Sequence, residues 1–124
     1  MSNELKHYPS TLPLPFSKAI RAGNLLLLSG QVSMSSNGEV IKGSITEQTN
    51  TIMERIGETL RECGADYNNI IKTTVWLTSM EHFSEFNEAY KKYFVENLPV
   101  RSTVTAGIAL DLDVEIEVQA WIAE

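Results

Sequence analysis

The sequence has one cysteine and few basic residues, and each shortage excludes a class of protein. Cys63 has no second cysteine to pair with, so no disulfide can form within the chain, which is typical of a reducing compartment. The 10 Lys and Arg residues are scattered and are outnumbered by 16 Asp and Glu, which leaves a net charge of −6. Because phosphate backbones repel that balance, we do not expect nucleic acid to be a partner.

Histidines and long apolar runs are also scarce. His7 and His82 are far apart and have no Cys or His at ligand spacing, so no metal site is expected. The longest aliphatic run, Leu25 to Leu28, is much shorter than the ~20 residues that span a bilayer. The segment MSNELKHYPST lacks the apolar core of a signal peptide, and no phosphate loop or dinucleotide motif occurs. We therefore expect a soluble, cytoplasmic protein that needs no cofactor and contacts no membrane.

The residues that are present predict one domain over 1–124, beginning with strands and a helix. Two short strands flank the turn-forming pair Gly23-Asn24. Ser44 and Glu47 have the spacing of a capping box, which predicts the start of a helix. Apolar side chains then recur at helical spacing, and Gly64 predicts the helix end through a left-handed conformation. Those apolar positions are Ile52, Ile56, Leu60 and Cys63.

The second half predicts a strand, a helix and two more strands. The β-branched and aromatic run NNIIKTTVWLTS is typical of a strand. Thr78 and Glu81 have capping-box spacing ahead of a second helix, which must end before Pro99. The apolar stripe of this helix is Phe83, Phe86, Tyr90 and Phe94. The closing segment, from Pro99 onward, predicts two strands joined by a turn.

This order of elements predicts a mixed sheet with two helices. Strand–helix–strand crossovers favour parallel, right-handed pairing, and the terminal hairpins add antiparallel pairs. Two helices can cover only one face of such a sheet. The other face needs a partner, so we expect an oligomer.

Charged residues in the two final strands are the first candidates for chemistry. Alternation places Arg101 and Thr103 on one side of their strand. Arg101 is either a solvent-facing residue or a guanidinium fork that binds a carboxylate through two parallel hydrogen bonds. Glu115 and Glu117 lie opposite the apolar side of the last strand. They are either exposed or covered by another subunit, where one of them could acquire a raised pKa and handle a proton or a water.

Two further positions allow both a structural and a functional interpretation. Asn87 lies beside the apolar stripe of the second helix, where its amide either caps a neighbouring loop or hydrogen-bonds into a ligand pocket. Ser29-Gly30 is either a plain strand end or a place where a ligand approaches the backbone. Without a Gly-x-Ser-x-Gly motif or an evident His partner, a serine-hydrolase triad is not supported.

Several segments together resemble the RidA/YjgF family of small enamine/imine deaminases over nearly the whole chain. They are PVRSTV, VEIEVQAWIA, LLLSGQV, IIKTTVWL and FNEAYKKYF. The resemblance implies a chorismate-mutase-like α+β fold, with two helices on one face of a mixed sheet. It also implies a homotrimer whose sheets line a central barrel and whose active sites lie in clefts between subunits.

The resemblance further implies roles for the candidate residues. Arg101 grips a substrate carboxylate, and Glu115, with Glu117 as the alternative, positions a water. The residues that line the pocket are Ser29, Gly30, Asn87, Phe16 and Thr103. Many deaminating relatives carry Tyr at the position of Phe16 and Cys at that of Thr103. In this chain Phe16 therefore keeps the aromatic ring but lacks the hydroxyl, and Thr103 keeps a backbone N–H but lacks the thiol.

The implied activity is hydrolysis of 2-imino acids or their enamine tautomers, such as 2-aminoacrylate/2-iminopropionate, to 2-keto acids and ammonia. Neither a metal nor a cofactor is implied. One alternative is a non-catalytic sensor of small carboxylates that uses the same cleft. Others are a pathway-specific aminoacrylate deaminase and an RNA-cleaving protein, and the acidic charge balance disfavours the last.

Overall fold

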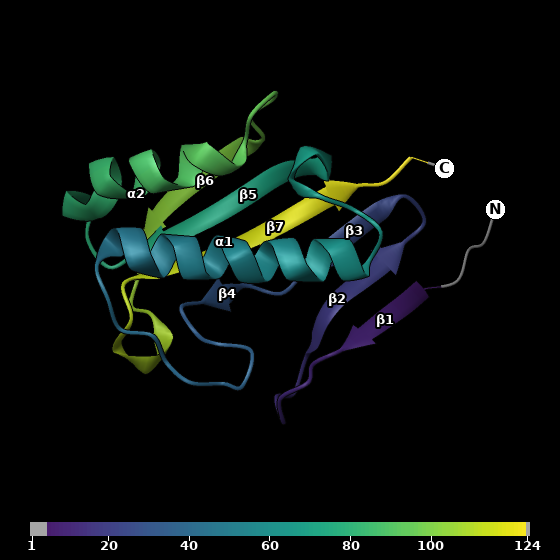
Figure 1. The fold of residues 1–124 in the computed structure, drawn as a ribbon, viewed down its shortest axis with the longest axis horizontal. Coiled ribbons are helices and arrows are strands. Elements are labelled where there is room, and N and C mark those ends of the chain that lie inside the picture. Colours follow the sequence, from purple (N-terminus) through teal and green to yellow (C-terminus); the bar gives the residue numbers. More distant parts are fainter. Residues whose placement is uncertain (1–4, 124) are drawn as a thin grey trace.

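The computed structural model describes residues 5–123, in which a mixed sheet carries both helices on one face (Figure 1). The strands run in the order β1 (Leu5–Pro9), β2 (Ser17–Ala22), β3 (Leu25–Leu28), β7 (Val114–Trp121), β5 (Ile70–Leu77) and β6 (Val100–Thr105). The short β4 (Gln31–Val32) pairs with β7 beyond β3. Only β5 and β6 pair in parallel among the described strands. The predicted α+β class with two helices is confirmed.

Helix α1 (Ile45–Glu62) begins and ends where the local sequence predicts. The Ser44 hydroxyl accepts a hydrogen bond from the Glu47 N–H, and the Glu47 carboxylate accepts one from the Ser44 N–H, which completes the capping box. Gly64 has φ +81°, and the N–H groups of Gly64 and Ala65 donate back to the last turn. The apolar positions predicted for this helix are buried in the core against the sheet.

Helix α2 (Phe83–Tyr90) follows a short 3₁₀ turn, and its start differs from the prediction. Ser79, not Thr78, accepts a hydrogen bond from the Glu81 N–H, so the predicted Thr78–Glu81 capping box is wrong. The Thr78 hydroxyl instead donates to Asp113 at 2.8 Å, because Thr78 directly follows β5, beside the loop that leads into β7. The helix ends ahead of Pro99, as predicted.

The two final strands do not form the predicted hairpin. β5 lies between them and pairs in parallel with β6 and antiparallel with β7. The loop from 106 to 113 passes around the end of β5, where the Ala106 N–H donates to Leu77 and the Thr78 N–H donates to Asp113. The alternation of side chains along these strands predicted which residues share a face. It does not predict which strand pairs with which. The strand β1 was also missed.

The sheet face opposite the helices is uncovered within residues 5–123. On β7 the side chains of Val114, Ile116, Val118 and Ala120 are buried, whereas Glu115, Glu117 and Gln119 are half-buried. Large apolar side chains also lie exposed on the open face, among them Leu27, Val104 and Trp121. Neither helix of the described chain combines the length and hydropathy needed to cross a membrane.

Candidate functional site

A bulge where β3 passes into β4 brings the first group of predicted residues together. Leu27 pairs with Gln119 and Gln31 pairs with Ile116. The β3–β4 segment therefore has one more residue than the part of β7 that it pairs with, which defines a bulge. Ser29 ties the bulge to β2, because its hydroxyl donates to the Ser17 carbonyl at 2.6 Å.

Because Gly30 has no side chain, it leaves space for the Glu115 carboxylate. A Cβ atom at position 30 would overlap Oε2 of Glu115. The reason for glycine here is space, since its φ does not lie in the left-handed region. The predicted pair Ser29-Gly30 therefore lies directly against Glu115.

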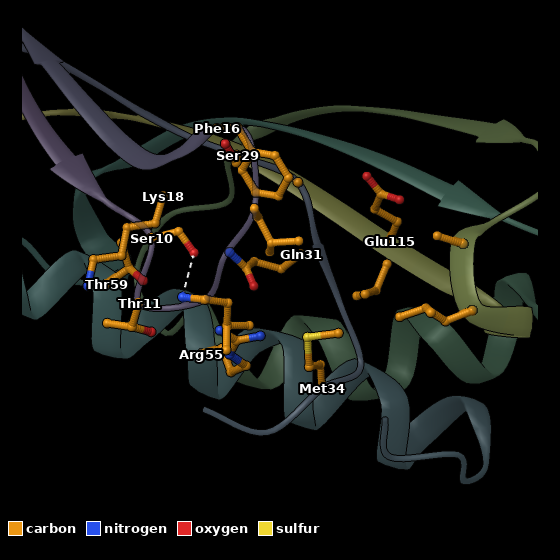
Figure 2. Close-up of a pocket in the computed structure, with 16 residues that line it drawn as sticks. Ser10, Thr11, Phe16, Lys18, Ser29, Gln31, Met34, Arg55, Thr59 and Glu115 are labelled. Carbon is orange, nitrogen blue, oxygen red and sulfur yellow. Dashed lines mark hydrogen bonds between the residues drawn. The ribbon is translucent and has the colours of Figure 1, made fainter. Parts of the chain in front are cut away.

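A cavity of about 540 Å³ opens beside the bulge (Figure 2). Phe16, Ser29, Gly30 and Glu115 line it, together with Arg55 and Thr59 of α1. A second hollow of about 440 Å³ shares Phe16, Ser29 and Gly30 but contains Glu117 instead of Glu115. The two glutamates that the sequence left as alternatives thus face different cavities around one bulge.

Burial changes the electrostatics of Glu115. Desolvation raises the pKa of Glu115 above its ordinary value, and repulsion from Glu117 raises it further. A carboxyl group with a raised pKa lies closer to the pH at which it can both accept and return a proton. The raised pKa is therefore a property of Glu115 that suits it to proton transfer.

A second group of predicted residues surrounds Arg101 on β6. Its guanidinium carbon lies 5.1 Å from the ring centroid of Tyr90, 5.4 Å from that of Phe86 and 5.5 Å from that of Phe83. These rings stabilise the cation through their π faces without neutralising it. Within residues 5–123 Arg101 takes part in no ion pair. Its charge is therefore available to an anion.

Asn87 lies on the helix that provides these rings. It follows Phe83 by four residues and precedes Tyr90 by three, so it lies on the same side of α2. Its Oδ1 atom is buried and has no hydrogen-bond donor among the described residues. A buried acceptor without a partner costs free energy, so the single chain leaves this amide unsatisfied.

The two groups lie on opposite faces of the sheet. Arg101 pairs with Thr73, which pairs with the buried Val118, so these three side chains point toward the helices. Glu115 pairs with Trp76 and points to the open face. Thr103 lies on the same side of β6 as Arg101. A single chain thus holds Phe16, Ser29, Gly30 and Glu115 in one group, and Arg101, Thr103 and Asn87 in another.

Sequence reasoning missed the roles of the aromatic stripe and of Arg55. The sequence identified the stripe on α2 only as apolar and did not indicate that the edge strand β6 places Arg101 against it. Arg55 lies between the core positions Ile52 and Ile56, and a cation beside an apolar helix face is the signal that could have revealed it. In the described part of the chain, no group of three or more His, Cys, Asp or Glu could hold a metal.

Comparisons with known proteins show which chains and structures this one resembles. The family described as Endoribonuclease L-PSP matches residues 9–123. A RutC family protein of Pyrococcus horikoshii is 41% identical over 107 residues, which cover 86% of this chain and 84% of that protein. The 2-iminobutanoate/2-iminopropanoate deaminase of Mus musculus is 36% identical over 86% of this chain and 78% of its own length. The crystal structure of yeast Mmf1 superposes with a TM-score of 0.89 at 30% identity, covering 97% of this chain and all of that one.

Proposed function

The chain belongs to the RidA/YjgF family, and we propose that it hydrolyses reactive 2-imino acids and their enamine tautomers to 2-keto acids and ammonia. The observation that carries the proposal is the Arg101 guanidinium, which is enclosed by three aromatic rings and has no acidic partner in the described chain. A guanidinium binds a carboxylate through two parallel hydrogen bonds. A 2-imino acid supplies that carboxylate next to its C=N carbon.

The reaction needs little beyond positioning and proton transfer. Arg101 holds the carboxylate and orients the C=N carbon, and Glu115 holds a water and accepts its proton as the oxygen attacks. That proton passes to the nitrogen and gives a carbinolamine. The hydroxyl proton of the carbinolamine is then transferred to the nitrogen, the C–N bond breaks, and the 2-keto acid and ammonia leave. Because the imine carbon is already electrophilic, the gain over solvent hydrolysis comes mainly from bringing the water and the imine together.

A complete site requires two chains, because Arg101 and Glu115 lie on opposite faces of the sheet. We propose a homotrimer in which Arg101 of one chain meets Glu115 of the next at a cleft between subunits. The open face supports this assembly: Val100 is 68% exposed and Trp121 49% exposed in the single chain. Packing such sheets around a three-fold axis removes these side chains from water and forms a central barrel. Sedimentation or light scattering gives the mass of the assembly directly.

Phe16, Thr103 and Asn87 complete the proposed pocket. Phe16 lines both hollows beside the bulge and provides an apolar wall. Thr103 offers its backbone N–H to the same carboxylate that Arg101 binds. The unpaired Oδ1 of Asn87 accepts a hydrogen bond from the substrate or from the neighbouring chain.

The decisive assay generates 2-iminopropanoate or 2-iminobutanoate with an amino-acid oxidase and follows release of the 2-keto acid. We expect the wild type to accelerate release over the spontaneous rate, and Arg101→Ala to abolish the acceleration. Arg21→Ala is the matched control, because Arg21 donates to the Gly23 carbonyl at a turn and lines neither cavity. Equal acceleration by the wild type and Arg101→Ala, or none by either, contradicts the proposal.

A non-catalytic sensor of small carboxylates is the second candidate. The uncompensated charge of Arg101 supports it as well, and Phe16 lacks the hydroxyl found at that position in many deaminating relatives. Calorimetric binding of 2-oxobutanoate without turnover of any imine would favour this candidate. A screen of imine substrates separates a general deaminase from a pathway-specific aminoacrylate deaminase. RNA cleavage is the remaining candidate, and a failure to bind RNA at low salt would exclude it.

A further inference from the structure

Arg55 is a half-buried cation that lines the cavity beside Glu115 and lies outside the proposed reaction. It projects from α1 four residues before Thr59, and both side chains line the cavity. Burial lowers the pKa of the Arg55 guanidinium, and nearby Glu58 partly offsets this. Glu58 is exposed, and the pair is not among the ion pairs of residues 5–123. Arg55 therefore brings a positive charge into the cavity wall without an acidic partner in contact.

The surroundings of Arg55 are polar on the side away from Glu115. Ser10, Thr11 and Lys18 line this part of the cavity. Lys18 is already neutralised, because its ammonium group lies 2.7 Å from the Glu62 carboxylate. In Figure 2 the Glu115 carboxylate lies apart from Arg55. One end of the cavity is thus acidic, and the other holds an unneutralised cation among hydroxyl groups.

The size of the cavity also exceeds what a small imino acid needs. A volume of about 540 Å³ lies within the ~300–1,000 Å³ of pockets that hold drug-sized ligands. A substrate of three or four carbons, held at its carboxylate and imine, leaves the Arg55 end filled only with water. A longer side chain that ends in an acceptor group fills that space and pairs the cation.

We propose that Arg55 binds a second carboxylate, so that the cavity selects 2-imino acids whose side chain ends in a carboxylate, such as 2-iminoglutarate. This inference rests on the proposed hydrolysis, and it adds a substrate class. The reaction is unchanged: water replaces the imine nitrogen, and the side-chain carboxylate takes no part in bond making. Arg55 is a specificity-determining residue rather than a catalytic one.

The kinetic test compares two imines generated in situ, 2-iminoglutarate from glutamate and 2-iminobutanoate from 2-aminobutanoate. We expect the wild type to favour 2-iminoglutarate in kcat/KM by roughly ten- to a hundred-fold, the range of a charge-assisted hydrogen bond. Arg55→Met should remove this preference and leave hydrolysis of 2-iminobutanoate intact, whereas Arg55→Lys should keep part of it. Arg61→Met removes the same charge from an exposed position of α1 that does not line the cavity, and should change neither rate.

A binding measurement separates this inference from the proposed function. By calorimetry we expect 2-oxoglutarate to bind the wild type more tightly than 2-oxobutanoate, and glutarate to compete with the former. Equal affinities in the wild type overturn the inference even if no variant folds. If 2-iminobutanoate is hydrolysed but 2-iminoglutarate is not favoured, the inference is wrong and the proposed function stands. If neither imine is hydrolysed, the proposed function is wrong. The carboxylate site is then still supported if the wild type binds 2-oxoglutarate selectively and Arg55→Met does not. Displacement of 2-oxoglutarate by acetate or phosphate at equal concentration would reveal a general anion site and contradict the selectivity.

Discussion

Gly30→Ala should separate activity from stability in this protein. The added Cβ atom overlaps Oε2 of Glu115, so the carboxylate must move by about 1 Å to reach an ordinary contact, and a 1 Å misplacement can cost roughly 10²-fold in rate. The obstructing atom is the end of a flexible side chain, so the fold itself need not shift. We therefore expect kcat/KM for 2-iminobutanoate to fall by about 100-fold, equivalent to ~2.7 kcal/mol of transition-state free energy.

The free energy of unfolding should change far less. An off-rotamer glutamate costs roughly 0.5–1.5 kcal/mol, and replacing glycine with alanine restrains the unfolded chain by roughly 0.4–1 kcal/mol, so the two effects nearly cancel. Thermal or urea unfolding of the variant measures this term. Gly107→Ala is the control, because a Cβ atom there meets nothing within 4 Å and the backbone has no positive φ.

Three outcomes would refute this reasoning. One is wild-type activity in Gly30→Ala, which would mean that the position of the Glu115 carboxylate is irrelevant to the rate. The second is a loss of stability that accounts for the loss of activity. The third is an equal effect of Gly107→Ala, which would show that the loss of activity does not depend on the contact with Glu115.

Two further predictions concern Glu115 and the packing of α1. Because burial raises the pKa of Glu115, the folded state holds its proton more tightly than the unfolded state, so Glu115 contributes stability at low pH that is lost as pH rises through the raised pKa. Relative to the wild type, Glu115→Gln should therefore be stabilised more at pH 7 than at pH 4, and it should abolish imine hydrolysis. Urea unfolding of the wild type, Glu115→Gln and Glu117→Gln at both pH values tests the direction. Gln48 is buried, donates to the Gly43 carbonyl and accepts from the Asp113 N–H, so Gln48→Leu should cost about 1–3 kcal/mol in urea unfolding. An unchanged unfolding midpoint in Gln48→Leu would show that these bonds do not stabilise the fold.

Most local predictions succeeded, because neighbours in sequence carry the interaction. The Thr78–Glu81 capping box failed because Thr78 binds Asp113, which is distant in sequence. The capping box at Ser44 and the left-handed Gly64 each involve residues within one helical turn, so the sequence contains the whole motif. The turn at Gly23, with φ +63° between two antiparallel strands, is of the same kind. Alternation on β7 also identified the buried and open faces correctly, because a strand has only two sides.

The pairing of strands failed for a corresponding reason. A connection of eight residues between β6 and β7 is compatible with a hairpin and also with a path around another strand. Which occurs depends on the α2 crossover, which places β6 in parallel beside β5 and leaves the other edge of β5 to β7. The residue pattern within β6 or β7 does not indicate whether these strands pair with each other or with β5.

The sequence by itself determined which groups are available: an arginine and a glutamate within strands, and a Ser-Gly pair that leaves space near the backbone. Tertiary structure alone decided how these groups meet. The bulge between β3 and β4 sets Gly30 against Glu115, whereas the register of β5 and β6 turns Arg101 toward the rings of α2. The reason is that side-chain identity is local, but contact depends on strand register and face, which arise only when residues about 30 to 85 positions apart pack together.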